Sequence, residues 1–524
     1  MTAPTAEART SPLPDGLVER LLATASVSPG AASVTVVAPF DGRPLYELPL
    51  AAESDVDAAV DSLRAGQRSW AARPLAERTR IMLRFHDLVL ARREEGLDIV
   101  QWETGKARRD AMEELLDVAL NARHYARDAR RLLRPRRHRG GLPLVVGAVQ
   151  VQHPKGVVGV LAPWNYPLMM AASDAIPALI AGNAVIIKPD VQTTLTALWV
   201  IDLMVQAGVP ESVVRVVPGD GPVVGPMVIE RVDYVMFTGS TRVGREVAAR
   251  CGQRLIGCSL ELGGKNAMII RADADIERAA EIATRACFAN SGQLCISMER
   301  LYVHEDVFEA FVAAFVTRVE GMVLSAGIGW AADMGSLISG RQLDRVLAHV
   351  QDAVAHGATV RAGGRARPDV GPFFLEPTVL TGVTSDMALC DEETFGPVVA
   401  VYPVGSDEEA VRLANGTRYG LNAAVITRDG AAGRTIALQL KAGTVNVNEA
   451  YGPSWATTRS PMGGMGDSGL GRRHGDEGLL KYTESQTVAT QRALGFGPQF
   501  GLSDEQWLGA LASSLGLMKR LGLK

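Results

Sequence analysis

The chain has no strong charge of either sign and contains few cysteines. Its 54 basic and 58 acidic residues leave a formal charge of -4, which gives no electrostatic basis for binding nucleic acid. Its five cysteines form no CxxC pair and have no histidine spacing suited to zinc. We therefore expect free thiols, no nucleic-acid partner and no metal ligands.

The sequence also lacks long apolar segments. No apolar run reaches the roughly 18 residues that are needed to cross a bilayer. Residues 1–9 are polar and contain an acid, so they do not resemble a secretory signal. Free thiols are typical of a reducing compartment. We expect a protein without a membrane span, located in the cytoplasm.

The chain does contain a regular alternation of strand and helix patterns. Its 524 residues are too many for one core and predict two or more domains. The first series has predicted strands at 156–162, 183–188, 213–217 and 234–237, with a helix at 168–180. The second has strands at 267–270, 301–303, 358–360 and 423–426, with helices at 276–289 and 308–319. This order predicts the α/β class with doubly wound, mostly parallel sheets.

Two segments outside these series leave alternatives open. The basic segment 123–139 ends a helical stretch and could form an anion-binding patch or a solvated helix face; we favour the second because the whole chain is slightly acidic. The tail begins like a capped helix, with Ser503 at the cap and Gln506 three residues later. Its apolar face could touch a membrane, a partner subunit or its own protein, and we favour the last. That face holds Trp507, Leu511, Leu515 and Met518.

A cysteine and a carboxylate carry the chemistry that the sequence predicts. Cys295 ends the order Phe-x-x-x-Gly-Gln-x-Cys, which begins at Phe288, and Glu261 stands 34 positions upstream in Leu-Glu-Leu-Gly-Gly-Lys-Asn at 260–266. A thiol among small residues and a carboxylate between apolar neighbours can serve as nucleophile and base at an aldehyde or acyl carbon. The alternatives, a buried structural thiol and a surface ion pair between Glu261 and Lys265, are disfavoured because the two motifs occur together.

These two motifs resemble those of the aldehyde dehydrogenase superfamily, and the resemblance extends over residues 51–487. It implies that Cys295 attacks an aldehyde, that Glu261 activates water to hydrolyse the thioester, and that Asn165 in Pro-Trp-Asn-Tyr-Pro stabilises the oxyanion. The product would be a carboxylic acid. The resemblance also implies binding of NAD or NADP by residues spread along the chain. They are Trp164, Lys188, Asp190, Val191, Gly239, Ser240, Leu262, Glu393 and Phe395.

The resemblance further implies how the chain is divided. We expect a Rossmann-type dinucleotide-binding domain at 1–265, a catalytic α/β domain at 266–460 and a return segment with the C-terminal helix at 461–524. A strand at about 140–156 and another near 487–491 would form a small β element for oligomerisation. The assembly would be a homo-oligomer, either a dimer or a tetramer.

Three positions depart from the pattern of well-known relatives. Many NAD-preferring members carry glutamate where Val191 stands, so we favour NADP, although Asp190 keeps a negative charge nearby. The segments 285–297 and 461–474 look most like actinobacterial NADP-type succinate-semialdehyde dehydrogenases, which makes succinate semialdehyde the favoured aldehyde. However, Ser173 replaces an arginine that binds the substrate carboxylate in that group, and Ser297 replaces a second cysteine. We hypothesise that Arg459 supplies the missing cation.

Other functions stay open from the sequence. A broad-specificity dehydrogenase of aliphatic or aromatic aldehydes is the main alternative. A coenzyme A-acylating dehydrogenase is disfavoured because such relatives generally lack the base that Glu261 supplies. A non-enzymatic structural member is disfavoured because both Cys295 and Lys188 are present.

Overall fold

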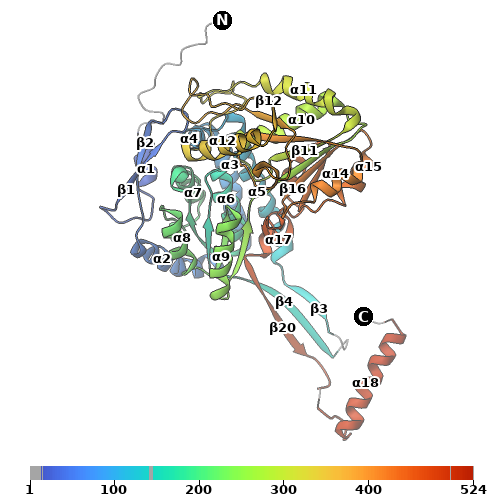
Figure 1. Cartoon of the computed structure of the whole chain (residues 1–524). Coiled ribbons are helices and arrows are strands. Elements are labelled where there is room, and N and C mark those ends of the chain that lie inside the picture. The colour runs from blue at the N-terminus through green and yellow to red at the C-terminus, as the bar shows by residue number, and fades with distance from the viewer. Residues whose placement is uncertain (1–12, 15, 141–144, 496, 523–524) are drawn as a thin grey trace.

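The body of the molecule is built on two large sheets, and a smaller sheet projects from it (Figure 1). The structure is a computed structural model that describes residues 13–14, 16–140, 145–495 and 497–522. This arrangement confirms the predicted α/β class. A hairpin and the predicted long helices come first. They are α1 Leu17–Leu22, β1 Ser33–Val37, β2 Pro44–Pro49, α2 Glu53–Ala72, α3 Leu75–Ala91, α4 Arg93–Thr104 and α5 Arg108–Leu133.

The first large sheet has six strands in the order β19-β9-β8-β5-β6-β7. Strands β5 to β9 are parallel, whereas β19 returns from the end of the chain and pairs antiparallel to β9. The predicted strands of the first series are all present and buried. The elements are β5 Val157–Leu161, α6 Pro167–Ala181, β6 Ala184–Lys188, η1 Val191–Thr193, α7 Thr194–Ala207, η2 Glu211–Val213, β7 Val214–Val216, α8 Gly221–Ile229, β8 Tyr234–Thr238, α9 Thr241–Gln253, β9 Gly257–Glu261 and β19 Gly469–Leu470.

The second large sheet has seven strands in the order β12-β13-β14-β11-β10-β16-β17. All neighbours are parallel except β12 and β13. Strands β13, β14 and β17 are additions to the predicted series. The elements are β10 Asn266–Ile270, α10 Ile276–Phe288, η3 Ala289–Gly292, β11 Met298–His304, η4 Glu305–Val307, α11 Phe308–Glu320, α12 Gly340–Ala355, β12 Thr359–Ala362, β13 Thr378–Thr381, α13 Ala388–Asp391, β14 Val398–Val404, α14 Asp407–Ala414, β16 Asn422–Ile426, α15 Gly430–Ala437, β17 Thr444–Val447 and α16 Gly452–Ala456. A separate two-stranded sheet pairs β15 Tyr419–Gly420 with β18 Met465–Gly466, and α17 Gly475–Leu480 follows.

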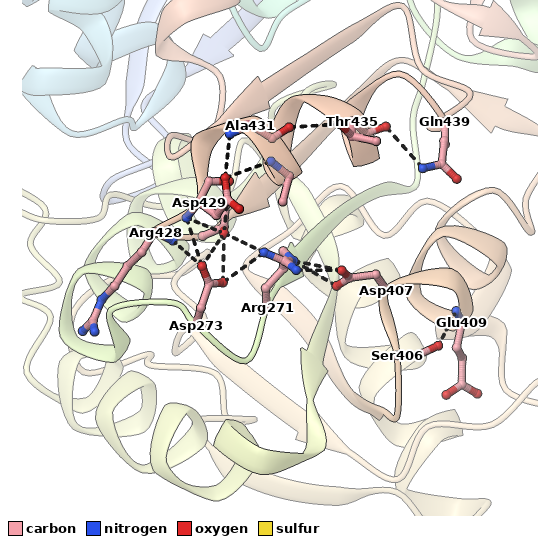
Figure 2. A network of polar contacts seen from close by, with 12 residues as sticks. Arg271, Asp273, Ser406, Asp407, Glu409, Arg428, Asp429, Ala431, Thr435 and Gln439 are labelled. Carbon is pink, nitrogen blue, oxygen red and sulfur yellow. Dashed lines mark hydrogen bonds and ion pairs between the residues drawn. The ribbon is translucent and has the colours of Figure 1, made fainter.

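A polar network closes the carboxyl edge of the second sheet (Figure 2). Arg271, which follows β10, donates to Asp407 at 3.0 Å and to Thr427 at 3.0 Å. Asp273 accepts from the Thr427 hydroxyl at 2.8 Å and from the Asp429 amide at 3.0 Å. These groups satisfy one another, so this edge is tied together by its own side chains. The amino edge of the same sheet, where Cys295 precedes β11, faces the first sheet instead.

The projecting sheet has three antiparallel strands in the order β20-β4-β3 (Figure 1). Its strands are β3 Arg136–Arg139, β4 Val146–Pro154 and β20 Thr483–Gln491, so the predicted early and late strands pair with each other. The predicted start of the early strand at Leu142 lies outside the described residues. The basic segment 123–139 forms the end of α5 and the exposed strand β3, which its helical interpretation did not include.

The C-terminal helix α18, Asp504–Arg520, begins at Ser503 with the predicted capping box. It lies beyond the projecting sheet and away from the body (Figure 1). Trp507 is buried, but Leu515 on the same predicted face is 53% exposed. The prediction that this whole face docks on the chain's own protein is therefore wrong for Leu515. No helix among the described residues is long and apolar enough to cross a membrane.

Candidate active site

A cavity of about 510 Å³ lies where the carboxyl edge of the first sheet meets the amino edge of the second. Loops after β5, β6, β8 and β9 contribute one wall, and the segments before β11 and β14 contribute the other. The cavity brings together most of the predicted site residues. Those that line it are Trp164, Asn165, Asp190, Gly239, Ser240, Glu261, Leu262, Cys295, Glu393 and Phe395.

Cys295 follows the short turn η3 and is partly exposed in this cavity. Its carbonyl oxygen accepts a hydrogen bond from Asn266 Nδ2 at 2.8 Å, which ties the cysteine loop to β10. Burial raises the pKa of the Cys295 thiol to about 12, and the nearby Glu261 and Glu393 carboxylates act in the same direction. The thiol is therefore neutral near pH 7 and needs a proton acceptor before it can attack.

Glu261 is the last residue of β9 and is 8% exposed. Its Oε1 atom has no hydrogen-bond partner among the described residues. Burial raises the pKa of this carboxyl to about 7, while the Arg473 and Lys481 cations oppose the shift. A carboxyl with this pKa exchanges protons readily at neutral pH, as a general base must.

Asn165 lies in the loop between β5 and α6. Its Nδ2 donates to the Gln293 carbonyl at 3.0 Å, so the amide is held against the cysteine loop. The backbone carbonyl of Asn165 accepts hydrogen bonds from Lys106 Nζ at 2.6 Å and from Asn290 Nδ2 at 3.0 Å. Both the side chain and the backbone of Asn165 are thus fixed before any substrate binds.

A buried ion pair that the sequence analysis did not identify supports this loop. Lys106 pairs with Glu114, and both side chains are fully buried. The other oxygen of Glu114 accepts from the amides of Leu168 at 2.9 Å and Met169 at 3.2 Å, at the start of α6. The signal lay in the spacing of α5, whose buried face carries polar residues at helical intervals. They are Asp110, Glu114, Asp117, Asn121, His124 and Asp128.

The strand-turn-helix segment from β8 to α9 forms the next part of the wall. Gly239 joins the strand to the helix, and the Ser240 side chain caps α9 by accepting from the Val243 amide. A Cβ at Gly244 would overlap the side chain of Leu262, so the glycine allows α9 to pack against the Glu261 segment. The amino terminus of α9 therefore points its free amides toward the cavity, where an anion would be stabilised.

The loop that carries Glu393 and Phe395 lies opposite. Glu393 Oε1 accepts from the Gly264 amide at 2.8 Å, beside Glu261. Phe395 has a φ of 56°, an unusual value for a bulky residue, and its amide donates to Glu299 at 3.0 Å. Its ring stands edge-on to Trp164 with centroids 5.5 Å apart. The Glu299 carboxylate, itself paired with Lys265, holds this strained loop in place.

Two of the predicted cofactor residues do not line the cavity. Lys188 is the last residue of β6 and is buried. Its Nζ atom lies near Gly221, 3.8 Å from the position that a Cβ atom would take on that glycine. Burial lowers the pKa of Lys188, and the Asp190 and Asp220 carboxylates oppose that shift. Val191 is half-buried at the start of η1. Asp190 caps this turn by accepting from the Gln192 amide at 3.0 Å.

Helix α12 supplies wall residues that the sequence analysis missed. Gln342 Nε2 donates to the Phe395 carbonyl at 2.7 Å, and Arg345 Nη2 donates to the Glu393 carbonyl at 2.7 Å. No motif marks this helix, because its contribution depends on how the second sheet folds back toward the first. The wall residues from this region are Ile338, Ser339, Arg341, Gln342 and Arg345.

The hypothesis that Arg459 takes the place of the missing arginine finds no support in the structure. Its Nη2 lies 3.0 Å from Asp128 Oδ1, and the Arg459 side chain is 77% exposed. Arg459 is absent from the lining of the cavity that holds Cys295. Ser173 of α6 is buried and donates to Asp117 Oδ2 at 2.6 Å, so its hydroxyl is used by the polar face of α5. Among the described residues, no group of three or more acidic, histidine or cysteine side chains is arranged to hold a metal ion.

Comparisons with known proteins agree with this geometry. The sequence model of the aldehyde dehydrogenase family matches residues 27–488. A Mycolicibacterium smegmatis protein named "Putative succinate-semialdehyde dehydrogenase", with NADP(+) given in its name, is 54% identical over 482 residues, 92% of this chain and 93% of that protein. A second protein of that name from Mycobacterium tuberculosis is 49% identical over 509 residues, 97% of this chain and 96% of its own.

Solved structures give the same result. An aldehyde dehydrogenase from Bacillus cereus in complex with NAD+ superposes with a TM-score of 0.86 at 34% identity, covering 92% of this chain and 100% of that one. The chain belongs to the aldehyde dehydrogenase family and is an NAD(P)-dependent enzyme that oxidises an aldehyde to a carboxylic acid.

Proposed function

We propose that this enzyme oxidises succinate semialdehyde to succinate and prefers NADP to NAD. The names of the two mycobacterial relatives support both the aldehyde and the cofactor. Val191 supports NADP, since a carboxylate there would repel a 2'-phosphate. One oxygen of Asp190 is engaged in capping η1, which leaves less of its charge directed at the cofactor.

The chemistry begins at Cys295. Its neutral thiol first loses a proton. The Glu261 carboxylate, whose pKa is about 7, is the base that accepts this proton. The thiolate then adds to the aldehyde carbon and forms a thiohemiacetal. The observation that carries this proposal is that one cavity brings together the thiol, the carboxylate and the Asn165 amide.

Asn165 stabilises the negative charge that develops on the aldehyde oxygen. One of its two amide hydrogens is used by the Gln293 carbonyl, which leaves the other to donate to an oxyanion. Because the side chain and backbone are already held, the amide needs little reorganisation when the charge appears.

The walls of the cavity fit a dinucleotide. Gly239 and the start of α9 suit the pyrophosphate, and Glu393 with Phe395 suits the nicotinamide ribose and ring. Lys188 lies behind this wall at the end of β6, and its proposed contact with ribose hydroxyls rests on the family resemblance. A Cβ at Gly263 would overlap the Glu393 carboxylate, so the glycine keeps this part of the cavity open. A nicotinamide held by Glu393 and Phe395 would supply the acceptor for the hydride that leaves the substrate carbon.

The thiol proton passes from Glu261 to solvent, and the regenerated carboxylate then completes the reaction by activating water against the thioester, which releases the carboxylic acid and frees Cys295. The Oε1 atom of Glu261 is buried and unpartnered among the described residues, so it can accept a proton from water. This step distinguishes an acid-forming enzyme from a coenzyme A-acylating one. A broad-specificity aldehyde dehydrogenase is the remaining alternative, because the structure gives Arg459 no place at the cavity.

A panel of aldehydes assayed with NAD and NADP tests the proposal. We expect the highest kcat/KM for succinate semialdehyde with NADP, and no turnover by Cys295→Ala. Equal kcat/KM values for benzaldehyde, propanal and succinate semialdehyde would contradict the substrate assignment. Full activity of Cys295→Ala would contradict the mechanism.

We also propose the division of the chain and its setting. The six-stranded sheet supports a dinucleotide-binding domain at 1–265, and the seven-stranded sheet supports a catalytic domain at 266–460. In the return segment at 461–524, β18 pairs with β15 of the catalytic domain and β19 joins the six-stranded sheet. The projecting sheet, which has little core of its own, supports a homo-oligomer. The free thiols support the cytoplasm as the location.

A further inference from the structure

Helix α18 exposes an apolar stripe along one edge of the face that holds Trp507. Leu508 is 54% exposed and Leu515 is 53% exposed. They lie seven residues apart, only about 20° from each other around the helix. Leu511 is half-buried between Trp507 and this stripe. An isolated helix of 17 residues is only marginally stable in water, so an uncovered stripe of this kind calls for a partner.

The Trp507 side of α18 already has a neighbour. Trp507, Leu511 and Met518 line a cavity of about 350 Å³ together with Val146 of β4 and Leu494 after β20. The helix is thus seated at the end of the projecting sheet by one face. The stripe of Leu508 and Leu515 lies about 90° around the helix from Trp507, outside the residues that line this cavity.

The ends of α18 carry opposite charges. Asp504 and Glu505 lie in its first turn, and Lys519 and Arg520 lie in its last. Asp504 and Lys519 fall on the same side of the helix as Leu508 and Leu515, because all four recur at intervals of four and seven residues. The stripe is therefore apolar in the middle, acidic at one end and basic at the other.

This order is symmetric about the middle of the helix. Leu508 and Leu515 lie equally far from the midpoint between Leu511 and Ala512, and so do Asp504 and Lys519. When two copies run antiparallel about a two-fold axis through that midpoint, each Leu508 meets Leu515 of the other copy. Each Asp504 likewise meets Lys519 of the other copy, and the helix dipoles also oppose each other favourably.

We propose that α18 is a docking surface for α18 of a second copy of this chain, paired antiparallel across the Leu508–Leu515 stripe. The matched charges select this occupant over a membrane surface, which would require an excess of cations on the polar face. The family match ends at residue 488, so this contact is an addition outside the matched fold. It rests on the proposed homo-oligomer but not on the proposed substrate.

Cross-linking tests the register. Under mild oxidation, the double variant Leu508→Cys/Leu515→Cys is expected to form a covalent dimer on a non-reducing gel. Each single variant is expected to stay uncross-linked, because equivalent residues lie about 10 Å apart along the paired helices. The matched control is Ser513→Cys/Arg520→Cys, which has the same spacing on another face. A double variant that remains as single chains, or a control that cross-links equally, would overturn the proposal.

Charge exchange tests the complementarity. Asp504→Lys and Lys519→Asp each place like charges opposite each other and are expected to lower the mass of the assembly in sedimentation equilibrium. The double exchange Asp504→Lys/Lys519→Asp is expected to restore it, whereas Arg520→Asp, on another side of the helix, is expected to have no effect. An unchanged mass of the assembly in both single variants would overturn the proposal. So would binding of the wild type to phosphatidylglycerol vesicles, if Leu508→Asp abolished this binding without altering the mass of the assembly. Aldehyde oxidation measured alongside shows separately whether the proposed function holds.

Discussion

At the scale of single residues, burial sets the chemistry of the cavity. The carboxyl of Glu261 is buried, the thiol of Cys295 and the carboxyl of Glu393 are partly buried, and burial raises the pKa of each. Glu261 differs from Glu393 in its hydrogen bonds. Glu393 accepts from the Gly264 amide, whereas Oε1 of Glu261 is free among the described residues to take a proton.

Hydrolysis of the acyl-enzyme is expected to follow the ionisation of Glu261. Only the carboxylate form is a base, and its pKa is about 7, so the rate should rise about tenfold per pH unit below 7 and level off above it. Single-turnover decay of a preformed acyl-enzyme measures this rate. Glu261→Gln should be at least about 100-fold slower and independent of pH over this range. A wild-type midpoint near the ordinary value of 4.5 would contradict the role given to burial.

Cofactor choice is expected to depend on the charge at position 191. Val191→Glu should lower the ratio of kcat/KM for NADP to that for NAD by about tenfold or more, because the new carboxylate repels a 2'-phosphate. Val191→Gln serves as the control, since it has the same length without the charge. Steady-state kinetics with both cofactors gives the ratio. An unchanged ratio in Val191→Glu would indicate that the 2'-phosphate of NADP does not bind near η1.

At the scale of elements, loops from separate strands are held against one another by hydrogen bonds between side chains and backbone groups. The cysteine loop, the Asn165 loop and the Glu393 loop share no regular hydrogen-bond ladder. Asn165 Nδ2 reaches the Gln293 carbonyl, and Glu299 reaches the Phe395 amide. The motifs at each loop could be predicted from the sequence, because each is continuous in the chain. The groups that join the loops could not be, since Lys106, Glu114 and Glu299 act only across folded elements.

Gly292 is expected to tolerate no side chain. Its φ is +68°, and a Cβ there would overlap the Gly396 carbonyl oxygen of the facing loop. Gly292→Ala should lower the free energy of unfolding by about 1–3 kcal/mol and also lower kcat, because the loop carries Cys295. Gly225→Ala in α8 is the control, since nothing lies within 4 Å of its Cβ position. Denaturant unfolding gives the free energy of unfolding of each variant, and steady-state kinetics gives its kcat. Equal effects of Gly292→Ala and Gly225→Ala would contradict the close approach of Gly292 to Gly396.

The buried pair of Lys106 and Glu114 is expected to matter for stability and for catalysis in different ways. Glu114→Ala leaves Lys106 charged and buried, which should cost about 3–5 kcal/mol in the free energy of unfolding. Lys106→Met/Glu114→Leu should recover most of this loss, because no charge remains unpaired. Its kcat should stay low, since Asn165 loses the donor to its carbonyl. Full activity in the double variant would show that the pair does not position Asn165.

At the scale of the whole molecule, the proposed active site lies at the junction of the two large sheets. The first sheet presents its carboxyl edge and the second presents its amino edge. The carboxyl edge of the second sheet is closed by Arg271, Asp273 and Thr427, so the site is confined to the junction (Figure 2). The projecting sheet and α18 lie apart from this junction (Figure 1).

Two arginines that lie on either side of the start of the return segment at 461, Arg459 and Arg473, are expected to differ sharply in their contribution to stability. Arg459 makes an exposed pair with Asp128, so Arg459→Ala should change the free energy of unfolding by no more than about 1 kcal/mol and leave the KM for succinate semialdehyde unchanged. Arg473 is buried and pairs with Asp174 at 2.6 Å, so Arg473→Ala should cost about 3–5 kcal/mol. Thermal unfolding and steady-state kinetics compare them. A raised KM in Arg459→Ala would return this residue to the substrate site.

The sequence by itself determined the α/β class, the family resemblance and the residues of each continuous motif, because these depend on local periodicity and spacing. It did not determine whether Arg459 lines the cavity, which face of α18 is covered or how α12 completes the cavity. Those depend on contacts between segments hundreds of residues apart, such as Asn165 with Gln293 and Arg459 with Asp128. Cys295, the proposed nucleophile, could be identified from the chain, but its raised pKa results from burial in the folded protein.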